Sequence, residues 1–349
     1  MRGGRDSDLW LLDRELRARH PDPFHDVDET TWHAAVEAAA RRAIDDEAVL
    51  IEVLRLLALL GPRDGHTTLW PLARGHRRSL RHLPLRVFLF QEGVYVVAGA
   101  YVGERVVAIG GVDVGEVTGR LAQLVPADNA HSRAARLPEW LTCVELLCGV
   151  GIVGDAARVE LELESGTVTL EPVDAASVPA LPPPPVPTDN AYVAYASTDA
   201  STAARVATDL ARLRGRRAVL DIRMNGGGDN TTYGAVLDAV AAHGDVVVLV
   251  GRGTFSAAAN FAAVVATVPC VSLVGEPTGG APNQWGDAED VVLPESGWRV
   301  RIATLYHEPI PGSTAAATEP DLLVPVRAED WLAGRDAALA AAVDFPSRN

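Results

Sequence analysis

The run Val246-Val247-Val248-Leu249-Val250-Gly251-Arg252-Gly253-Thr254-Phe255-Ser256-Ala257-Ala258-Ala259 decides the fold. Its five apolar residues predict a buried strand, the glycines predict a turn, and the alanines predict the start of a helix. Such a turn presents Ser256 at the carboxyl end of a strand, where α/β sheets gather their sites. Ser256 is therefore a candidate nucleophile. The alternative is an ordinary helix N-cap, a role that serine often fills.

Strands and helices alternate on both sides of this run. We expect strands at 192–195, 218–222, 246–250 and 271–274, and helices at 202–213, 233–242 and 256–267. This alternation predicts a wound α/β domain over residues 190–345. The glycine-rich turn Asn225-Gly226-Gly227-Gly228 also follows a strand, so we expect it on the same edge of the sheet as Ser256.

Three further parts precede this domain. Helical spacing from residue 8 to 60, with Asp45 as an N-cap and a stop at Gly61-Pro62, predicts a helical N-terminal cap within residues 1–75. Short β-type runs predict a small β-rich unit over 80–176, with a helical insertion around 138–147. The prolines within 177–189 predict an extended connector.

The composition excludes several functions. The net charge of −15 disfavours nucleic acid and anionic membranes as partners. No stretch is long and apolar enough for a membrane span or a signal peptide, so we expect the chain as given in the cytoplasm. Its three cysteines lack metal-binding or disulfide spacing, and we expect no metal and no organic cofactor. All 31 basic residues are arginine, which excludes a serine–lysine dyad.

Five blocks of the sequence, in the same order, resemble the C-terminal-processing (tail-specific) serine peptidases and the core of tricorn protease. They are Asp64-Gly65-His66-Thr67, Leu220 to Gly228, Thr254-Phe255-Ser256-Ala257, Gly275-Glu276-Pro277-Thr278-Gly279-Gly280 and Glu319-Pro320-Asp321. The resemblance implies a ClpP/crotonase-like fold for the α/β domain. In the β-rich unit, Leu85 to Val97 and Tyr101 to Val114 resemble the end of a PDZ-like module, which is degenerate here. It also implies a serine-type peptidase that acts on a peptide or small acyl substrate. Family members often oligomerise, so a homo-oligomer is compatible with it.

The resemblance also implies catalytic roles. Ser256 matches the nucleophile, and Ala281 stands where the tail-specific branch carries its lysine base. The tricorn branch uses a histidine instead, which corresponds to His66, and the late glutamate of that branch corresponds to Glu319. Gly65 replaces the serine that connects the two in that branch.

The sequence leaves two assignments open. The group that orients His66 is Glu319, Asp64 or a hydroxyl of Thr67 or Thr68. The rival base is His307 in Tyr306-His307-Glu308.

The predicted chemistry is acyl transfer. A histidine suits the role of general base because its ordinary pKa lies near neutrality. Backbone N–H groups of Gly227 or Gly228, together with that of Ala257 at the helix start, are the predicted oxyanion donors.

Two other functions on the same fold are alternatives. One is a non-catalytic binding module, as in the retinoid-carrying modules of vertebrate photoreceptor-matrix proteins. The other is a crotonase-like hydratase or isomerase, in which the glycine turn would stabilise a thioester enolate.

Overall fold

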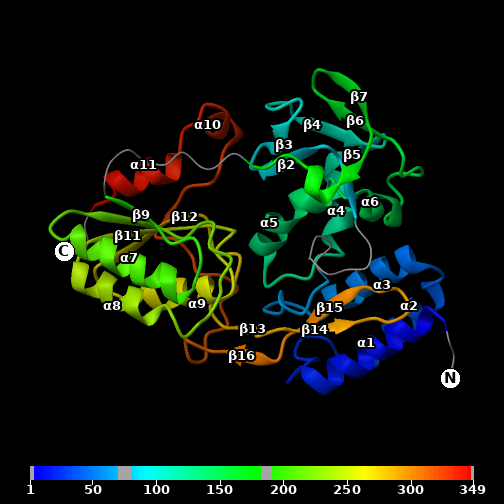
Figure 1. The fold of residues 1–349 in the computed structure, drawn as a ribbon, viewed down its shortest axis with the longest axis horizontal. Helices are drawn as coiled ribbons and strands as arrows, with labels where there is room; N and C mark the ends of the chain where they lie inside the picture. Colours follow the sequence, from blue (N-terminus) through cyan, green and yellow to red (C-terminus); the bar gives the residue numbers. More distant parts are fainter. Residues whose placement is uncertain (1–3, 70–79, 182–190, 347–349) are drawn as a thin grey trace. The chain divides into compact units, whose positions relative to one another are not determined.

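The computed structural model describes residues 4–69, 80–181 and 191–346. Contacts within the chain gather it into two compact units. Unit 1 consists of residues 1–127, 136–182 and 285–306, and unit 2 of residues 128–135, 183–284 and 307–349. The division into four parts stays a prediction, and most of the connector predicted at 177–189 lies outside the described residues. Figure 1 labels the helices and strands.

Unit 1 begins with the helices that the spacing predicted, namely α1 (Asp6–Arg19), α2 (Glu29–Arg42) and α3 (Asp46–Ala58). The Asp45 carboxylate accepts a hydrogen bond from the Ala48 N–H at 2.7 Å, which confirms the predicted N-cap of α3. The apolar faces of these helices share one core with the small sheets that follow.

Short strands and helices make up the β-rich part of unit 1. They are β1 (Arg81–His82), β2 (Leu85–Phe90), β3 (Gly93–Gly99), β4 (Val106–Ile109), β5 (Val112–Asp113), α4 (Val114–Ala122), α5 (Ala130–Trp140), α6 (Val144–Gly149), β6 (Val159–Leu163), β7 (Gly166–Leu170), β8 (Val173–Asp174) and the 3₁₀ turn Ala175–Ser177. The strands form antiparallel sheets in the orders β1-β8, β2-β3 and β5-β4-β6-β7. Helices α5 and α6 occupy the predicted helical insertion, and the first residues of α5 belong to unit 2.

A later hairpin also belongs to unit 1. Strands β14 (Glu289–Val292) and β15 (Arg299–Ile302) pair antiparallel. Strand β13 (Gln284–Gly286) pairs with β16 (Leu305–His307), and the residues Gln284 and His307 of this pair belong to unit 2. The buried carboxylate of Asp8 in α1 accepts from the N–H groups of Glu295 and Ser296, at 3.1 and 2.8 Å. The Trp298 indole donates to the Asp46 carbonyl at 2.7 Å. These long-range bonds hold the hairpin to the N-terminal helices.

Unit 2 is built on a five-stranded parallel sheet with the order β17-β12-β11-β10-β9. Its strands are β9 (Tyr192–Ala194), β10 (Ala218–Asp221), β11 (Val246–Val250), β12 (Val271–Gly275) and β17 (Leu322–Leu323). Its helices are α7 (Ala200–Arg212), α8 (Gly234–His243), α9 (Ala257–Val265), α10 (Ala328–Leu332) and α11 (Ala337–Asp344). The predicted alternation of strands and helices is therefore confirmed.

Both faces of this sheet are covered, which accounts for the continuous apolar runs of its strands. Val246, Val248 and Val250 of β11 pack in the core that α7, α8 and α9 share. Val247 and Leu249, which alternate with them, pack with Ala338 and Ala342 of α11 on the opposite face. Figure 1 shows α11 across the sheet from α7 and α8. Because all strands are parallel, the turns after β10 and β11 lie at the same edge.

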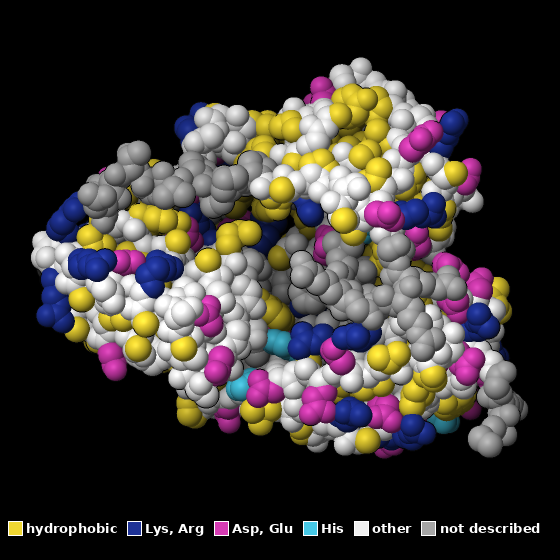
Figure 2. All heavy atoms as spheres, in the orientation of Figure 1, with side chains coloured by type: hydrophobic (Ala, Val, Ile, Leu, Met, Phe, Trp, Pro, Cys, Tyr) yellow, Lys and Arg dark blue, Asp and Glu magenta, His cyan; other side chains and the backbone are white. Residues whose placement is uncertain are grey.

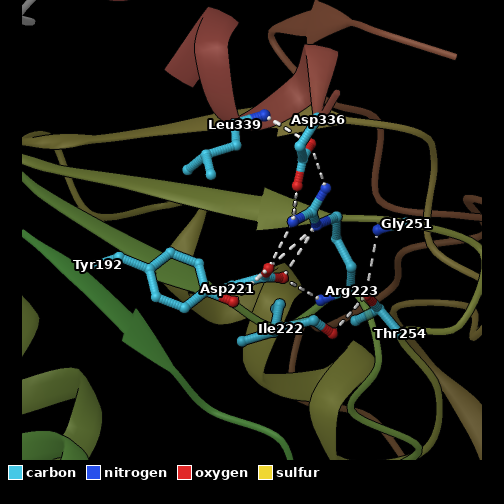
Figure 3. A network of polar contacts seen from close by, with 8 residues as sticks. All are labelled: Tyr192, Asp221, Ile222, Arg223, Gly251, Thr254, Asp336 and Leu339. Atoms are coloured by element: carbon cyan, nitrogen blue, oxygen red, sulfur yellow. Dashed lines mark hydrogen bonds and ion pairs between the residues drawn. The ribbon is translucent and has the colours of Figure 1, made fainter. Parts of the chain in front are cut away.

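Arg223 joins this edge to α11 (Figure 3). Its guanidinium donates to both carboxylate oxygens of Asp336, at 2.8 and 2.7 Å, and also binds Asp221 at 2.6 Å. Asp336 in turn caps α11 by accepting from the Leu339 N–H at 2.9 Å. The Tyr192 hydroxyl completes the network by donating to Asp221 at 2.9 Å. The segment that leads into the glycine turn is thereby fastened to the C-terminal helix.

The surface carries charges of both signs, and acidic and basic side chains are interspersed on the face drawn in Figure 2. Exposed ion pairs of this kind contribute little to stability. None of the helices in the described ranges combines the length and apolar character that a bilayer crossing requires.

The ion pair of Arg223 with Asp336 predicts a pH-dependent stability. Burial by itself raises the pKa of Asp336, but the hydrogen bonds and charge of Arg223 outweigh it and hold that pKa below the usual value. A lowered carboxyl pKa contributes stability above the unfolded-state pKa of about 3.9, and the contribution is lost as the pH falls further. Asp336→Asn should therefore lower the free energy of unfolding by about 2 kcal/mol at pH 7, and by clearly less at pH 3.

Urea unfolding at the two pH values measures this difference. Asp344→Asn, at the exposed end of the same helix, is the matched control and should change stability by less than about 0.5 kcal/mol. An equal loss for Asp336→Asn at both pH values would contradict the assignment.

Candidate active site

Ser256 occupies a strained turn between β11 and α9. Its backbone has φ 55° and ψ −133°, a region that residues with a side chain rarely adopt and that costs about 1–3 kcal/mol. Within the described part of the chain, its hydroxyl makes no capping hydrogen bond to α9. Ser256 therefore stands at the N-cap position of α9, but its side chain does not cap the helix as an ordinary N-cap serine does. The side chain is partly exposed, as access for a substrate requires.

The glycine turn lies directly against Ser256, as the sequence predicted. A Cβ at Gly227 would stand 2.4 Å from the Ser256 Cβ and 3.0 Å from the Ala257 nitrogen. A Cβ at Gly280 would stand 3.2 Å from the Ser256 nitrogen and 2.5 Å from the Ala259 Cβ. Glycine is required at both positions because a side chain would displace the serine or the start of α9.

Hydrogen bonds hold the turn on either side of the serine. The Gln284 amide donates to the Ser256 carbonyl at 3.0 Å. The Thr254 hydroxyl donates to the Ile222 carbonyl at 2.9 Å, and the Thr254 carbonyl accepts from the Gly280 N–H at 3.0 Å. Both side chains are buried. Sequence reasoning did not single out Gln284, and the nucleophile block contained Thr254 without assigning it a role.

Asn225 organises the glycine turn from inside. Its buried side chain donates to the Tyr195 carbonyl at 2.9 Å and accepts from the Gly227 N–H at 2.9 Å. Gly228 follows with φ 145°, and a Cβ there would lie 2.1 Å from the Thr198 carbonyl oxygen. The Gly227 N–H is thus engaged within the turn.

His66 lies in unit 1, in a loop held by its neighbours. The buried Asp64 accepts from the Thr67 N–H at 3.1 Å and faces Nε2 of His20 at 3.3 Å. The Thr67 hydroxyl accepts from the Ala303 N–H at 3.1 Å. Arg136 donates to the Gly65 carbonyl at 2.9 Å. Which group orients His66 stays a prediction.

The other predicted groups lie in unit 2. Glu319 has an exposed side chain and follows Thr318, which is buried. His307 is half-buried, and its Nδ1 lies 3.4 Å from the amide nitrogen of Asn230, close along the chain to the glycine turn. Ser256, Gly227, Gly228 and Ala257 are brought together in this unit, whereas the meeting of His66 with Ser256 stays a prediction.

Among the residues that the structure describes, no group of three or more histidine, cysteine, aspartate or glutamate side chains is placed to hold a metal ion.

Comparison with solved structures identifies the fold. Two structures of CPAF match over nearly the whole chain: a serine-to-alanine mutant has 12% identity and a TM-score of 0.71, covering 98% of this chain and 96% of that one. Mature CPAF in complex with lactacystin has 12% identity and a TM-score of 0.70, covering 98% and 97%. A protein of Parabacteroides merdae matches with 16% identity and a TM-score of 0.50, covering 98% and 97%.

The chain therefore has the fold of CPAF. No protein-family model matches the sequence, and no curated protein does.

The strained backbone predicts an unusual ranking of variants at the candidate nucleophile. Ser256→Gly should be more stable than Ser256→Ala by about 1 kcal/mol, because glycine adopts φ 55° without strain. At Ser201, an exposed position in the first turn of α7, the glycine variant should instead be less stable than the alanine variant by about 1 kcal/mol. Thermal or urea unfolding of the four variants tests the ranking, and the same order at both positions would contradict strain at Ser256.

Proposed function

We propose that the chain is a serine hydrolase, of the tricorn-like peptidase type, that cleaves peptide or other acyl bonds through Ser256. The observation that carries the proposal is the backbone of Ser256, which is strained, packed against Gly227 and not used as a helix cap. Proteins retain such strain mainly at functional sites. The fold shared with CPAF supports the proposal.

The proposed reaction proceeds by acyl transfer. His66 takes the proton of the Ser256 hydroxyl while the oxygen attacks the substrate carbonyl carbon, and the carbonyl electron pair moves to its oxygen. Collapse of this intermediate breaks the bond to the amine or alcohol, which receives the proton from His66. Water then attacks the acyl-enzyme by the same route and releases the acid.

The oxyanion donors in this proposal are the N–H groups of Gly228 and Ala257. The Gly227 N–H is not one of the proposed oxyanion donors, because it donates to the Asn225 side chain. Ala257 begins α9, so its N–H is also favoured by the helix dipole. One donor of this kind is typically worth about 3–4 kcal/mol in the transition state.

Glu319 is the carboxylate that we propose to orient His66. We prefer it to Asp64, whose carboxylate already accepts from the Thr67 N–H and lies 3.3 Å from Nε2 of His20. His307 is the less suitable base: if Asn230 donates to its Nδ1, the ring proton sits on Nε2, which then has no lone pair to accept the serine proton.

The finer fold assignments are part of the same proposal. The parallel sheet with helices on both faces supports a ClpP/crotonase-like fold for unit 2. The small antiparallel sheet β5-β4-β6-β7 supports a PDZ-like origin for the β-rich part.

A fluorophosphonate probe tests the proposed nucleophile. The protein should gain one phosphonyl group on Ser256, seen by intact mass and peptide mapping, and Ser256→Ala should gain none. His66→Ala should slow labelling by about a thousandfold or more, because the base is lost. His33→Ala, an exposed histidine in α2, is the matched control and should label at the wild-type rate.

Two outcomes would change the account. If His307→Ala abolishes labelling and His66→Ala does not, the base is His307. If the folded wild-type protein is not labelled, the nucleophile assignment fails, and the binding-module or crotonase-like alternatives take its place.

A further inference from the structure

A short segment from the first half of the sequence belongs to the unit of the candidate nucleophile. Residues 128–135, which include the start of α5, cluster with unit 2 although the chain on either side belongs to unit 1. Asn129 stands immediately before α5, and its Oδ1 accepts from the N–H groups of His131 and Ser132 at 2.8 and 2.9 Å. This half of the amide caps the helix.

The other half of the Asn129 amide binds two distant segments. Its Nδ2 donates to the Thr278 carbonyl at 3.2 Å and to the Ala316 carbonyl at 2.6 Å. Asp128, which is fully buried, accepts from the Ala281 N–H at 3.1 Å. The segment 278–281 is therefore held at both of its ends by two consecutive residues.

Segment 278–281 is in turn packed against the nucleophile turn. The Gly280 N–H donates to the Thr254 carbonyl at 3.0 Å, and a Cβ at Gly280 would stand 3.2 Å from the Ser256 nitrogen. A Cβ at Gly279 would stand 2.1 Å from the Arg252 carbonyl oxygen. The backbones are so close that a shift of segment 278–281 must move the turn that carries Ser256.

The same segment also restrains the stretch of chain that precedes Glu319. Thr278 and Thr318 exchange two hydrogen bonds: the Thr278 N–H donates to the Thr318 carbonyl at 3.2 Å, and the Thr318 N–H donates to the Thr278 hydroxyl at 2.9 Å. With the bond from Asn129 to Ala316, the residues immediately before Glu319 are held from two sides.

We propose that Asn129, assisted by Asp128, is a positioning residue for the nucleophile, acting through segment 278–281 without touching the substrate. The expected effect on reaction rate rests on the proposed function. The restraint of segment 278–281 by these hydrogen bonds does not depend on that function. If the role of Asn129 were purely structural, loss of its hydrogen bonds would lower only the stability of the protein. A positioning residue also slows the reaction of folded protein, because a small misplacement of a nucleophile has a large effect on rate.

The variant Asn129→Asp separates these roles. Aspartate keeps the oxygen that caps α5 but cannot donate to the Thr278 and Ala316 carbonyls, and it places a negative charge against both. We expect the maximal rate of fluorophosphonate labelling at Ser256 to fall about tenfold or more, while the probe concentration at half-maximal rate changes by less than about twofold. Asn129→Ser keeps a capping oxygen and adds no charge, so its maximal labelling rate should fall by less than that of Asn129→Asp. It replaces Asn129→Asp in the experiment if that variant does not fold.

The control is Asp113→Ala, which removes the cap of α4 in unit 1, where Asp113 accepts from the Gly115 and Glu116 N–H groups at 2.8 and 3.3 Å. It should lower the melting temperature without slowing the labelling. Folded Asn129 variants that label at the wild-type rate would overturn the inference.

Amide hydrogen exchange provides a readout that does not depend on activity. The amides of Gly280 and Ala281 should exchange faster in the Asn129 variants than in the wild type, and unchanged protection there would overturn the inference even if the protein has no activity. A wild-type protein that resists labelling would refute the proposed function alone. The two failures are therefore distinguishable.

Discussion

The site depends on one constraint, the left-handed backbone of Ser256 at φ 55°. A serine relaxed into an ordinary conformation would turn its hydroxyl elsewhere, so the surroundings must supply the 1–3 kcal/mol that such a conformation typically costs. They do so through close backbone contacts that glycine alone permits, at Gly227 on one side and Gly280 on the other. The hydrogen bond from Gln284 to the Ser256 carbonyl adds a further restraint. One glycine of each motif is thus required by packing around a single residue.

The parallel sheet explains why these segments meet. Its in-register strands bring the turns after β10 and β11 to one edge, where Asn225 bonds the glycine turn internally and to the Tyr195 carbonyl. Arg223 fastens the same turn to α11 through Asp336, so the C-terminal helix contributes to the edge that holds the nucleophile (Figure 3). The ion pair of Arg223 and the hydrogen bonds of Asn225 therefore restrain the same turn at this edge of the sheet.

Local patterns in the sequence predicted much of this arrangement. The apolar run 246–250 followed by glycine and alanine predicted strand, turn and helix, and the alternation of such runs predicted the parallel sheet that brings the glycine turn to Ser256. Contacts between distant residues were not predictable in this way. Asn129 and Thr278 are 149 positions apart, and a hydrogen bond between an amide and a carbonyl leaves no periodic signal. The engagement of Asp64 by His20 was missed for the same reason, as was the return of residues 285–306 to unit 1.

A crystal structure of the protein after reaction with a fluorophosphonate would test the role of Ser256. We expect phosphorus bonded to the Ser256 oxygen, with one phosphonyl oxygen about 3 Å from both the Gly228 and Ala257 nitrogens. We also expect the His66 ring beside the adduct. A phosphonyl oxygen directed into solvent, away from both N–H groups, would contradict the oxyanion assignment, and an adduct on another residue would contradict the role of Ser256 itself.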